Sequence, residues 1–270
     1  MTLGEALAAA RQRIDRLDAR LLLQYATGFS HADLLARPET PIIAPAYTQF
    51  SEWVERRAAG EPLAYLVGEA EFRGQVFQVS PAVLIPRPET EVLIDLALEK
   101  LRGLSTPRVL DLGTGSGIVA ISLALECPAA EVVAVDISPE AVTVARNNAG
   151  RLGAAVDFRT SDWYANLAGE HFDLIASNPP YVAGGDPHLA LDGLPYEPQL
   201  ALTDGADGLD CIRRIVATAA AHLNPGGWLL FEHGYDQGEA SRNLLAAAGF
   251  KETFTHPDLA GTDRVSGAYL

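Results

Sequence analysis

The second half of the chain alternates between short apolar runs and longer stretches in which apolar residues recur three or four positions apart. A short run bounded by turn residues is typical of a buried strand, and the longer spacing is typical of a helix with one apolar face. Helices are expected near 118–125, after Ser138, and over 206–223 and 237–248. Strands are expected at 108–112, 132–135, 156–159, 172–177, 228–232, 250–255 and 265–270. The pattern predicts an α/β fold in which seven strands form one Rossmann-like sheet.

The first 70 residues show helical spacing alone. Thr2 and Glu5 have the spacing of a capping box, and the apolar positions from Leu3 to Leu17 fall three or four apart. Further helices are expected at 18–27, after Ser30, around 47–57, and after Pro62. We therefore predict three parts: a small all-helical domain (1–70), a β-hairpin linker (71–85) with a turn at Arg73-Gly74, and an α/β domain (86–270) that begins with a helix over 92–101.

A glycine-rich loop follows the first strand of the α/β domain. Gly113-Thr114-Gly115-Ser116-Gly117 leads into a helix, and the next strand ends in Asp136. In nucleotide-binding βαβ units the glycines admit the ligand to the backbone, and such an acid takes ribose hydroxyls. The third glycine arrives one residue earlier than in the dinucleotide pattern. This spacing disfavours NAD and favours a cofactor with an amino acid tail, whose ammonium group Asp111 is placed to meet.

The third strand is followed by an acid and an indole, Asp162 and Trp163. These two side chains are suited to flank an adenine ring. A buried tryptophan beside a helix-capping acid is an equal alternative for this pair taken alone.

The tetrapeptide Asn178-Pro179-Pro180-Tyr181 follows the fourth strand, at the edge where open α/β sheets bind ligands. The prolines fix the backbone and offer no N–H, so the Asn178 side-chain oxygen and the Pro179 carbonyl are acceptors for the two hydrogens of one planar NH₂ group. Tyr181 adds a flat face. No general base accompanies them, which suits transfer from a strong electrophile such as a sulfonium methyl group, where placement of the reacting atoms dominates catalysis. The alternative is a proline-rich loop that only closes the strand.

The stretch from 182 to about 205 has no clear periodicity. Structureless segments of this length are uncommon unless they are functional or disordered. Because it leaves directly from the tetrapeptide, we expect it to cover the substrate.

Composition limits the possible partners. The 270 residues carry 20 Lys and Arg against 35 Asp and Glu, a net charge of −15. This leaves little from which to assemble the basic face that duplex nucleic acid requires, so no direct nucleic-acid partner is expected. Acidity suits a basic protein partner or simply solubility. We also expect no membrane span, a soluble cytoplasmic monomer, no metal, and two small core cysteines, Cys127 and Cys211.

Taken together, the motifs resemble those of the class I S-adenosylmethionine-dependent methyltransferases, and within them the enzymes that methylate the side-chain amide nitrogen of glutamine in peptide chain release factors. The resemblance covers nearly the whole chain. Its marks are Glu61-Pro-Leu-Ala-Tyr65, Ile85-Pro-Arg-Pro-Glu-Thr-Glu91, Asp111-Leu-Gly-Thr-Gly-Ser-Gly117, Ser177-Asn-Pro-Pro-Tyr-Val182, Tyr196-Glu-Pro198, Asp207-Gly-Leu209 and Asp258-Leu-Ala-Gly261.

The resemblance implies N5-methylation of the glutamine in the Gly-Gly-Gln motif of release factors, a reaction linked to translation termination. The implied cofactor is S-adenosyl-L-methionine, with S-adenosyl-L-homocysteine as product, bound at 113–117, Asp136, Trp163 and Asn178. The glutamine site would be 178–181, and the helical domain would contact the release factor. Arg87 and Glu89, which composition alone assigns to a stiff linker, become neighbours of the site.

Two other functions remain open from the residues. An adenine N6-methyltransferase would use the same tetrapeptide on a flipped base, although the acidic balance argues against it. A nucleotide-binding regulatory module, in which the helical domain recruits a partner without catalysis, is the alternative outside enzymes.

Overall fold

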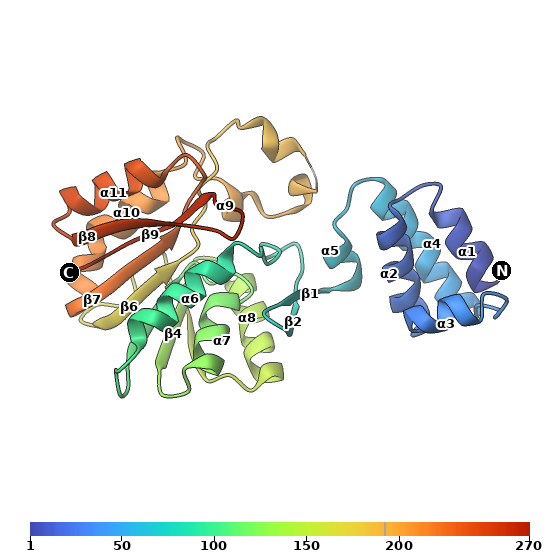
Figure 1. The fold of residues 1–270 in the computed structure, drawn as a ribbon, viewed down its shortest axis with the longest axis horizontal. Helices are drawn as coiled ribbons and strands as arrows, with labels where there is room; N and C mark the ends of the chain where they lie inside the picture. Colours follow the sequence, from blue (N-terminus) through green and yellow to red (C-terminus); the bar gives the residue numbers. More distant parts are fainter. Residues whose placement is uncertain (192) are drawn as a thin grey trace. The chain divides into compact units, whose positions relative to one another are not determined.

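The computed structural model describes residues 1–191 and 193–270. Its contacts divide the chain into two compact units. Residues 1–69 with 193–196 form the first unit, and residues 70–191 with 197–270 form the second (Figure 1).

The first unit is helical. Its helices are α1 (Leu3–Ala10), α2 (Arg16–Thr27), α3 (His31–Ala36), α4 (Ala44–Ala58) and α5 (Leu63–Val67). Their apolar faces meet in one core that includes Leu3, Leu22, Leu23, Phe50 and Leu66. The capping box at Thr2 and Glu5 is confirmed.

The expected first helix through Leu17 is wrong, because α1 ends at Ala10. The Asp15 side chain accepts a hydrogen bond from the Leu17 backbone N–H at 2.7 Å and caps a new helix. An acid at this position favours the start of a helix over its interior.

A two-stranded sheet opens the second unit. It consists of β1 (Glu69–Phe72) and β2 (Gln75–Gln78), and the expected turn at Arg73-Gly74 is present, with φ of 49° and 70°. The hairpin ends earlier than the predicted 71–85 because β2 ends at Gln78 and the next element is α6. Val79 and Val83 are instead buried from an irregular segment.

Seven strands form the main sheet, as the sequence predicts. They are β3 (Arg108–Leu112), β4 (Glu131–Asp136), β5 (Val156–Thr160), β6 (Phe172–Ser177), β7 (Leu223–Glu232), β8 (Lys251–Pro257) and β9 (Asp263–Tyr269). The order is β5-β4-β3-β6-β7-β9-β8; the first five are parallel, and β9 is antiparallel to both of its neighbours.

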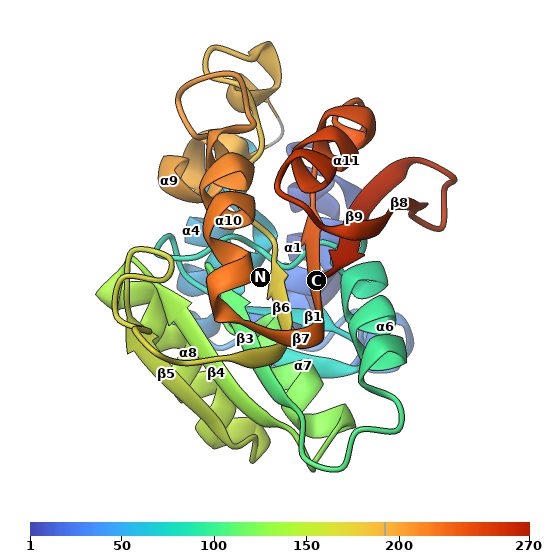
Figure 2. The ribbon, with the colours of Figure 1, turned by 90° about the vertical axis from the view of Figure 1, so that its left-hand side faces the viewer.

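Helices cover both faces of this sheet (Figure 2). On one face, α6 (Thr90–Leu101), α7 (Ile118–Glu126) and α8 (Pro139–Leu152) pack on alternate residues of the strands, such as Val109. On the other face, α10 (Asp210–Ala219) and α11 (Gly238–Ala247) pack on the intervening residues, such as Leu110. Burial on both faces explains why the strands read as continuous apolar runs.

The direction in which the chain crosses the sheet reverses between β3 and β6. After β3 the chain proceeds outward through β4 and β5, and then returns to place β6 on the other side of β3. Leu112 and Ser177 are paired at the ends of these two strands. The segments that begin at Gly113 and Asn178 therefore leave side by side at the point where open sheets bind ligands.

The loop after Tyr181 contains short ordered turns rather than a structureless run. They are η1 (Pro187–Ala190), η2 (Leu194–Tyr196) and α9 (Gln199–Leu202); residue 192, which belongs to the expected covering loop, lies outside the described residues. The two ends of the loop are joined, because the Val182 N–H donates to the Leu202 carbonyl at 3.0 Å and the Gly184 N–H donates to the Ala206 carbonyl at 2.8 Å.

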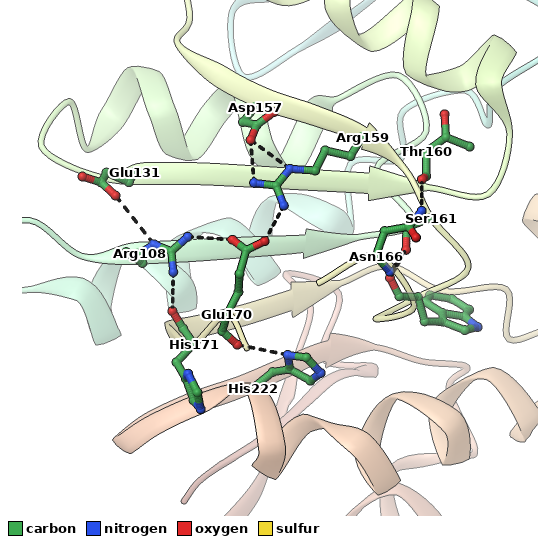
Figure 3. A network of polar contacts seen from close by, with 11 residues as sticks. Arg108, Glu131, Asp157, Arg159, Thr160, Ser161, Asn166, Glu170, His171 and His222 are labelled. Atoms are coloured by element: carbon green, nitrogen blue, oxygen red, sulfur yellow. Dashed lines mark hydrogen bonds and ion pairs between the residues drawn. The ribbon is translucent and has the colours of Figure 1, made fainter. Parts of the chain in front are cut away.

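Charged residues join β3 and β5 to the segment before β6 (Figure 3). Arg108, at the start of β3, donates to Glu170 at 2.9 Å and to the His171 carbonyl at 2.9 Å. Arg159 forms a second ion pair with Glu170, and its hydrogen bond lowers the pKa of that carboxyl. Arg108 and Glu170 lie at the amino ends of β3 and β6, and Arg159 reaches Glu170 from the carboxyl-terminal half of β5. The cluster joins these strands, and none of the three residues lines the cavity.

Candidate active site

A cavity of about 520 Å³ opens beside the carboxyl ends of β3, β4 and β6. The walls come from residues 82–87, the glycine loop, the segments after β4, β5 and β6, and residues 198–214. Ten residues expected to form the site line it: Arg87, Gly113, Thr114, Gly115, Ser116, Asp136, Asp162, Trp163, Asn178 and Pro180. Five expected residues are not in the cavity wall: Glu89, Asp111, Gly117, Pro179 and Tyr181.

The three glycines of the loop have different roles. All have positive φ, between 55° and 88°, which favours glycine. A Cβ on Gly115 would meet open space, whereas a Cβ on Gly117 would lie 2.8 Å from Ile121 and 3.2 Å from Ala145. Gly115 therefore leaves the backbone accessible to a ligand, and Gly117 permits α7 to pack closely against α8.

Asp136 fixes the glycine loop from the end of β4. One carboxylate oxygen accepts from the Gly115 N–H and the other from the Ser138 N–H, each at 2.9 Å. Burial raises the pKa of Asp136, while these hydrogen bonds oppose the shift. Each oxygen retains a lone pair, so the carboxylate can also accept from a pair of ligand hydroxyls.

Asp111 lies beneath the glycine loop and is 1% exposed. One oxygen accepts from the Thr114 hydroxyl at 2.7 Å and from the Ala120 N–H at 3.2 Å, whereas the buried Oδ1 has no hydrogen-bond partner among the residues that the structure describes. Burial raises the pKa of Asp111 to about 7. A buried acceptor without a donor is costly, so this oxygen is suited to bind a donor supplied by a ligand.

Trp163 reaches the glycine loop from the turn after β5. Its ring lies 3.6 Å from the position that a Cβ on Gly113 would occupy, and its backbone has a φ of 48°. The preceding residue, Asp162, forms an ion pair with Arg214 at 2.9 Å. The half-buried indole thus presents its ring to the cavity, and the acid beside it is already paired.

Asn178 is held from behind by a residue of another element. Its side-chain NH₂ donates to the Thr90 hydroxyl at 3.1 Å, and that hydroxyl donates to Glu232 at 2.7 Å. The other oxygen of Glu232 accepts from the Tyr181 hydroxyl at 3.0 Å. Across residues 1–191 and 193–270, no hydrogen bond to the Asn178 side-chain oxygen is present, and Asn178 lines the cavity.

Arg87 lies at the cavity wall and is paired with a buried acid. Glu197, which is 4% exposed, accepts from Arg87 and from the Ile85 N–H at 3.0 Å. This contact unites the Pro-Arg-Pro-Glu-Thr-Glu segment with the Tyr-Glu-Pro segment 110 residues later. Glu89 precedes α6 without a side-chain cap hydrogen bond.

The site predicted from the sequence did not include three residues that support it: Thr90, Glu197 and Glu232. Thr90 and Glu197 lie within segments that carried the family resemblance, which is the signal that pointed to them. Glu232 ends an apolar strand, and a charged residue at the carboxyl end of a buried strand is the pattern that already marked Asp136.

Both cysteines are free and only partly buried, so their expected place in the core is wrong. Cys211 lines the cavity, and burial raises its pKa to about 11. Within the part of the chain that the structure describes, no group of three or more His, Cys, Asp or Glu side chains is arranged to hold a metal ion. None of the described helices has the length and apolar character needed to cross a membrane.

Both units match protein-family models. Residues 3–68 match the PrmC N-terminal domain, and residues 90–192 match the methyltransferase small domain. Among solved structures, a methyltransferase from Pyrococcus furiosus is 19% identical, with a TM-score of 0.53 over 81% of this chain and 98% of that one. The 16S rRNA N2 G1207 methyltransferase of T. thermophilus, solved with AdoMet and guanosine, is 25% identical, with a TM-score of 0.55 over 74% of this chain and 49% of that one.

Curated relatives match along the full length. The release factor glutamine methyltransferase of Bordetella pertussis is 50% identical over 95% of this chain and 96% of its own. Those of Burkholderia pseudomallei and Neisseria gonorrhoeae are 49% and 46% identical, each over the whole of this chain and at least 96% of their own. With both units matched and the cavity at the expected edge of the sheet, the chain belongs to the release factor glutamine methyltransferase family, within the class I methyltransferases.

Proposed function

We propose that the chain transfers a methyl group from S-adenosyl-L-methionine to the side-chain amide nitrogen of the glutamine in the Gly-Gly-Gln motif of peptide chain release factors. The observation that carries this proposal is the orientation of Asn178, whose NH₂ is bound to Thr90 while its oxygen remains available at the cavity. The relatives that match over the full length support the choice of substrate.

The residues around the glycine loop fit the proposed cofactor. The partnerless Oδ1 of Asp111 suits an ammonium group, the spare lone pairs of Asp136 suit ribose hydroxyls, and the Trp163 ring suits an adenine face. Gly115 leaves the space through which a ligand reaches the backbone. When bound, S-adenosyl-L-methionine supplies an electrophilic sulfonium methyl group.

The tetrapeptide positions the substrate amide. We assign the Asn178 oxygen and the Pro179 carbonyl to the two amide hydrogens and Pro180 to an apolar wall. Tyr181 does not line the cavity, and its hydroxyl is bound to Glu232. Two acceptors fix the plane of the amide and the direction of its nitrogen, which contributes to rate through placement. When the nitrogen–methyl bond formed, the sulfur–methyl bond would break and S-adenosyl-L-homocysteine would leave. The nitrogen would then release one proton to solvent, so no residue of the site is required to act as a base.

We assign recognition of the release factor to the helical unit and the segment over 182–205. Release factors act in translation, so this function places the protein in the cytoplasm, and we propose that it acts as a monomer.

The test is methylation of a purified release factor with labelled cofactor, followed by peptide mass spectrometry. We expect one methyl group on the glutamine of the Gly-Gly-Gln motif. A release factor in which this glutamine is replaced by alanine is the matched control and should remain unlabelled. Label on any other residue, or none on the intact factor, would contradict the proposed function.

A further inference from the structure

A chain of hydrogen bonds behind the cavity links three segments that are distant in sequence. Thr90, the first residue of α6, and Glu232, the last residue of β7, are both fully buried. The Thr90 hydroxyl lies between the Asn178 NH₂ at 3.1 Å and Glu232 Oε2 at 2.7 Å. Neither Thr90 nor Glu232 lines the cavity, so both act on it through Asn178, which does.

The direction of these hydrogen bonds follows from the number of protons available. An ionised carboxylate accepts only, and a hydroxyl has a single hydrogen to give. Once Thr90 donates to Glu232, its oxygen is left as an acceptor, which selects the NH₂ side of the Asn178 amide. The Asn178 oxygen is then left to face the cavity as an acceptor.

The same carboxylate also holds the far end of the tetrapeptide. Glu232 Oε1 accepts from the Tyr181 hydroxyl at 3.0 Å, and Gln237 Nε2 donates to the Tyr181 carbonyl at 3.0 Å. Two hydroxyl donors thus bind one carboxylate. Burial raises the pKa of Glu232, and the hydrogen bonds from Thr90 and Tyr181, together with the charge of Arg264, oppose that shift. The arrangement keeps Asn178 and Tyr181 in a fixed relation before a substrate binds.

We propose that Thr90 and Glu232 are positioning residues that set the Asn178 amide with its oxygen toward the cavity, and thereby select a substrate group that brings an NH₂, such as a carboxamide, over a carboxylate. This inference rests on the proposed function. A carboxylate substrate would place two acceptors against the Asn178 oxygen, whereas a glutamine amide places a donor there.

The test compares Thr90→Val with Thr90→Ser. Valine keeps the shape of threonine without the hydroxyl, and serine keeps the hydroxyl without the methyl group. We expect kcat for the release factor to fall about tenfold or more in Thr90→Val, since the amide is free to turn, and to be largely restored in Thr90→Ser. The dissociation constant for S-adenosylmethionine, measured by calorimetry, should change less than about twofold, because Thr90 does not line the cavity. Thr143→Val removes an exposed hydroxyl that donates to the Pro139 carbonyl in α8, and serves as the control for the substitution itself.

If Thr90→Val does not fold, Thr90→Ala takes its place, because the smaller side chain leaves room for water on Glu232. A kcat in the hydroxyl-free variant within twofold of Thr90→Ser would overturn the inference. Glu232→Gln replaces one acceptor by a donor, so one of the two hydroxyls loses its acceptor, and a kcat of about a third or less of the wild-type value is expected. A wild-type kcat in this variant would show that Glu232 does not help to orient the Asn178 amide.

The wild-type protein in the same assay separates the two hypotheses. If the wild-type protein labels the release factor and Thr90→Val labels it equally fast, only the positioning role of Thr90 and Glu232 is contradicted. If the wild-type protein does not label the release factor, the proposed function fails.

Discussion

Arg87 and Glu197 form an ion pair across 110 residues of chain, with the carboxylate almost fully buried. Arg87 lines the cavity, and the residue after Glu197, Pro198, lines it as well. Because the Ile85 N–H also donates to Glu197, this one carboxylate holds both the segment before α6 and a point within the loop that leaves Tyr181. The pair thus closes one wall of the cavity.

Replacing Arg87 by methionine should destabilise the second unit. Among the described residues, Glu197 would retain only the Ile85 N–H as donor. A buried carboxylate that loses its charged partner lowers the free energy of unfolding by about 1–3 kcal/mol. Urea unfolding measures this loss. Arg213→Met is the matched control, because Arg213 pairs with Asp207 and both side chains are more than a third exposed. The control should lose much less stability, since exposed pairs are screened by water. If both variants lost the same free energy of unfolding, burial of Glu197 would not increase the contribution of its ion pair to stability.

Asn178→Ala should separate turnover from cofactor binding. Alanine removes the acceptor proposed for the substrate amide, so kcat should fall about 10²-fold or more, as for other lost transition-state contacts. The calorimetric dissociation constant for S-adenosylmethionine should change much less. Asn147→Ala, on the exposed surface of α8, should leave both quantities unchanged. Methylation by Asn178→Ala at the wild-type rate would show that this side chain does not position the substrate.

Asp136→Asn should weaken cofactor binding. The new NH₂ group must face either the Gly115 N–H or the Ser138 N–H, so one donor loses its acceptor and the glycine loop is no longer held on both sides. We expect the dissociation constant for S-adenosylmethionine to rise about tenfold or more. Asp95→Asn is the control and should bind the cofactor as the wild type does, because Asp95 is an exposed residue of α6 that pairs with Arg73, and neither residue lines the cavity. Unchanged affinity in Asp136→Asn would exclude the assigned role.

Asp111 should make the stability of the cofactor-free protein depend on pH. Burial raises its pKa from 3.8 to about 7 in the folded state, so between these values the folded protein binds a proton that the unfolded chain does not. The stabilising contribution is complete below the unfolded pKa and is lost as the pH rises through about 7.

Asp111→Asn is neutral at every pH and provides the reference. The free energy of unfolding of the wild type minus that of Asp111→Asn should fall by about 1 kcal/mol per pH unit between pH 5 and 6.5, measured by urea unfolding without cofactor. A constant difference across this range would mean that the folded-state pKa of Asp111 is close to its ordinary value.

Local sequence patterns were sufficient to predict most of the helices and strands and many of the residues that line the cavity. The seven strands, the helices between them, the glycine loop and the position of Asn178 after β6 all follow from periodicity and turn chemistry within short windows. The first helix was overextended for the same reason, since Ile14 and Leu17 kept the helical spacing past the point where Asp15 starts a new helix. A helix cap competes with periodicity, and the apolar pattern alone does not decide between them.

The sequence by itself therefore determined the fold class, the ligand edge of the sheet and the residues that leave from it, because these depend on neighbours within one element. Only the tertiary structure decided which side chains support them. Thr90 binds Glu232 across 142 residues, and Arg87 binds Glu197 across 110. Asp111 keeps a buried oxygen that has no hydrogen-bond partner in the described part of the chain. The physical reason is that burial and hydrogen-bond direction are set by residues that pack together from different elements, and spacing along the chain carries no information about those contacts.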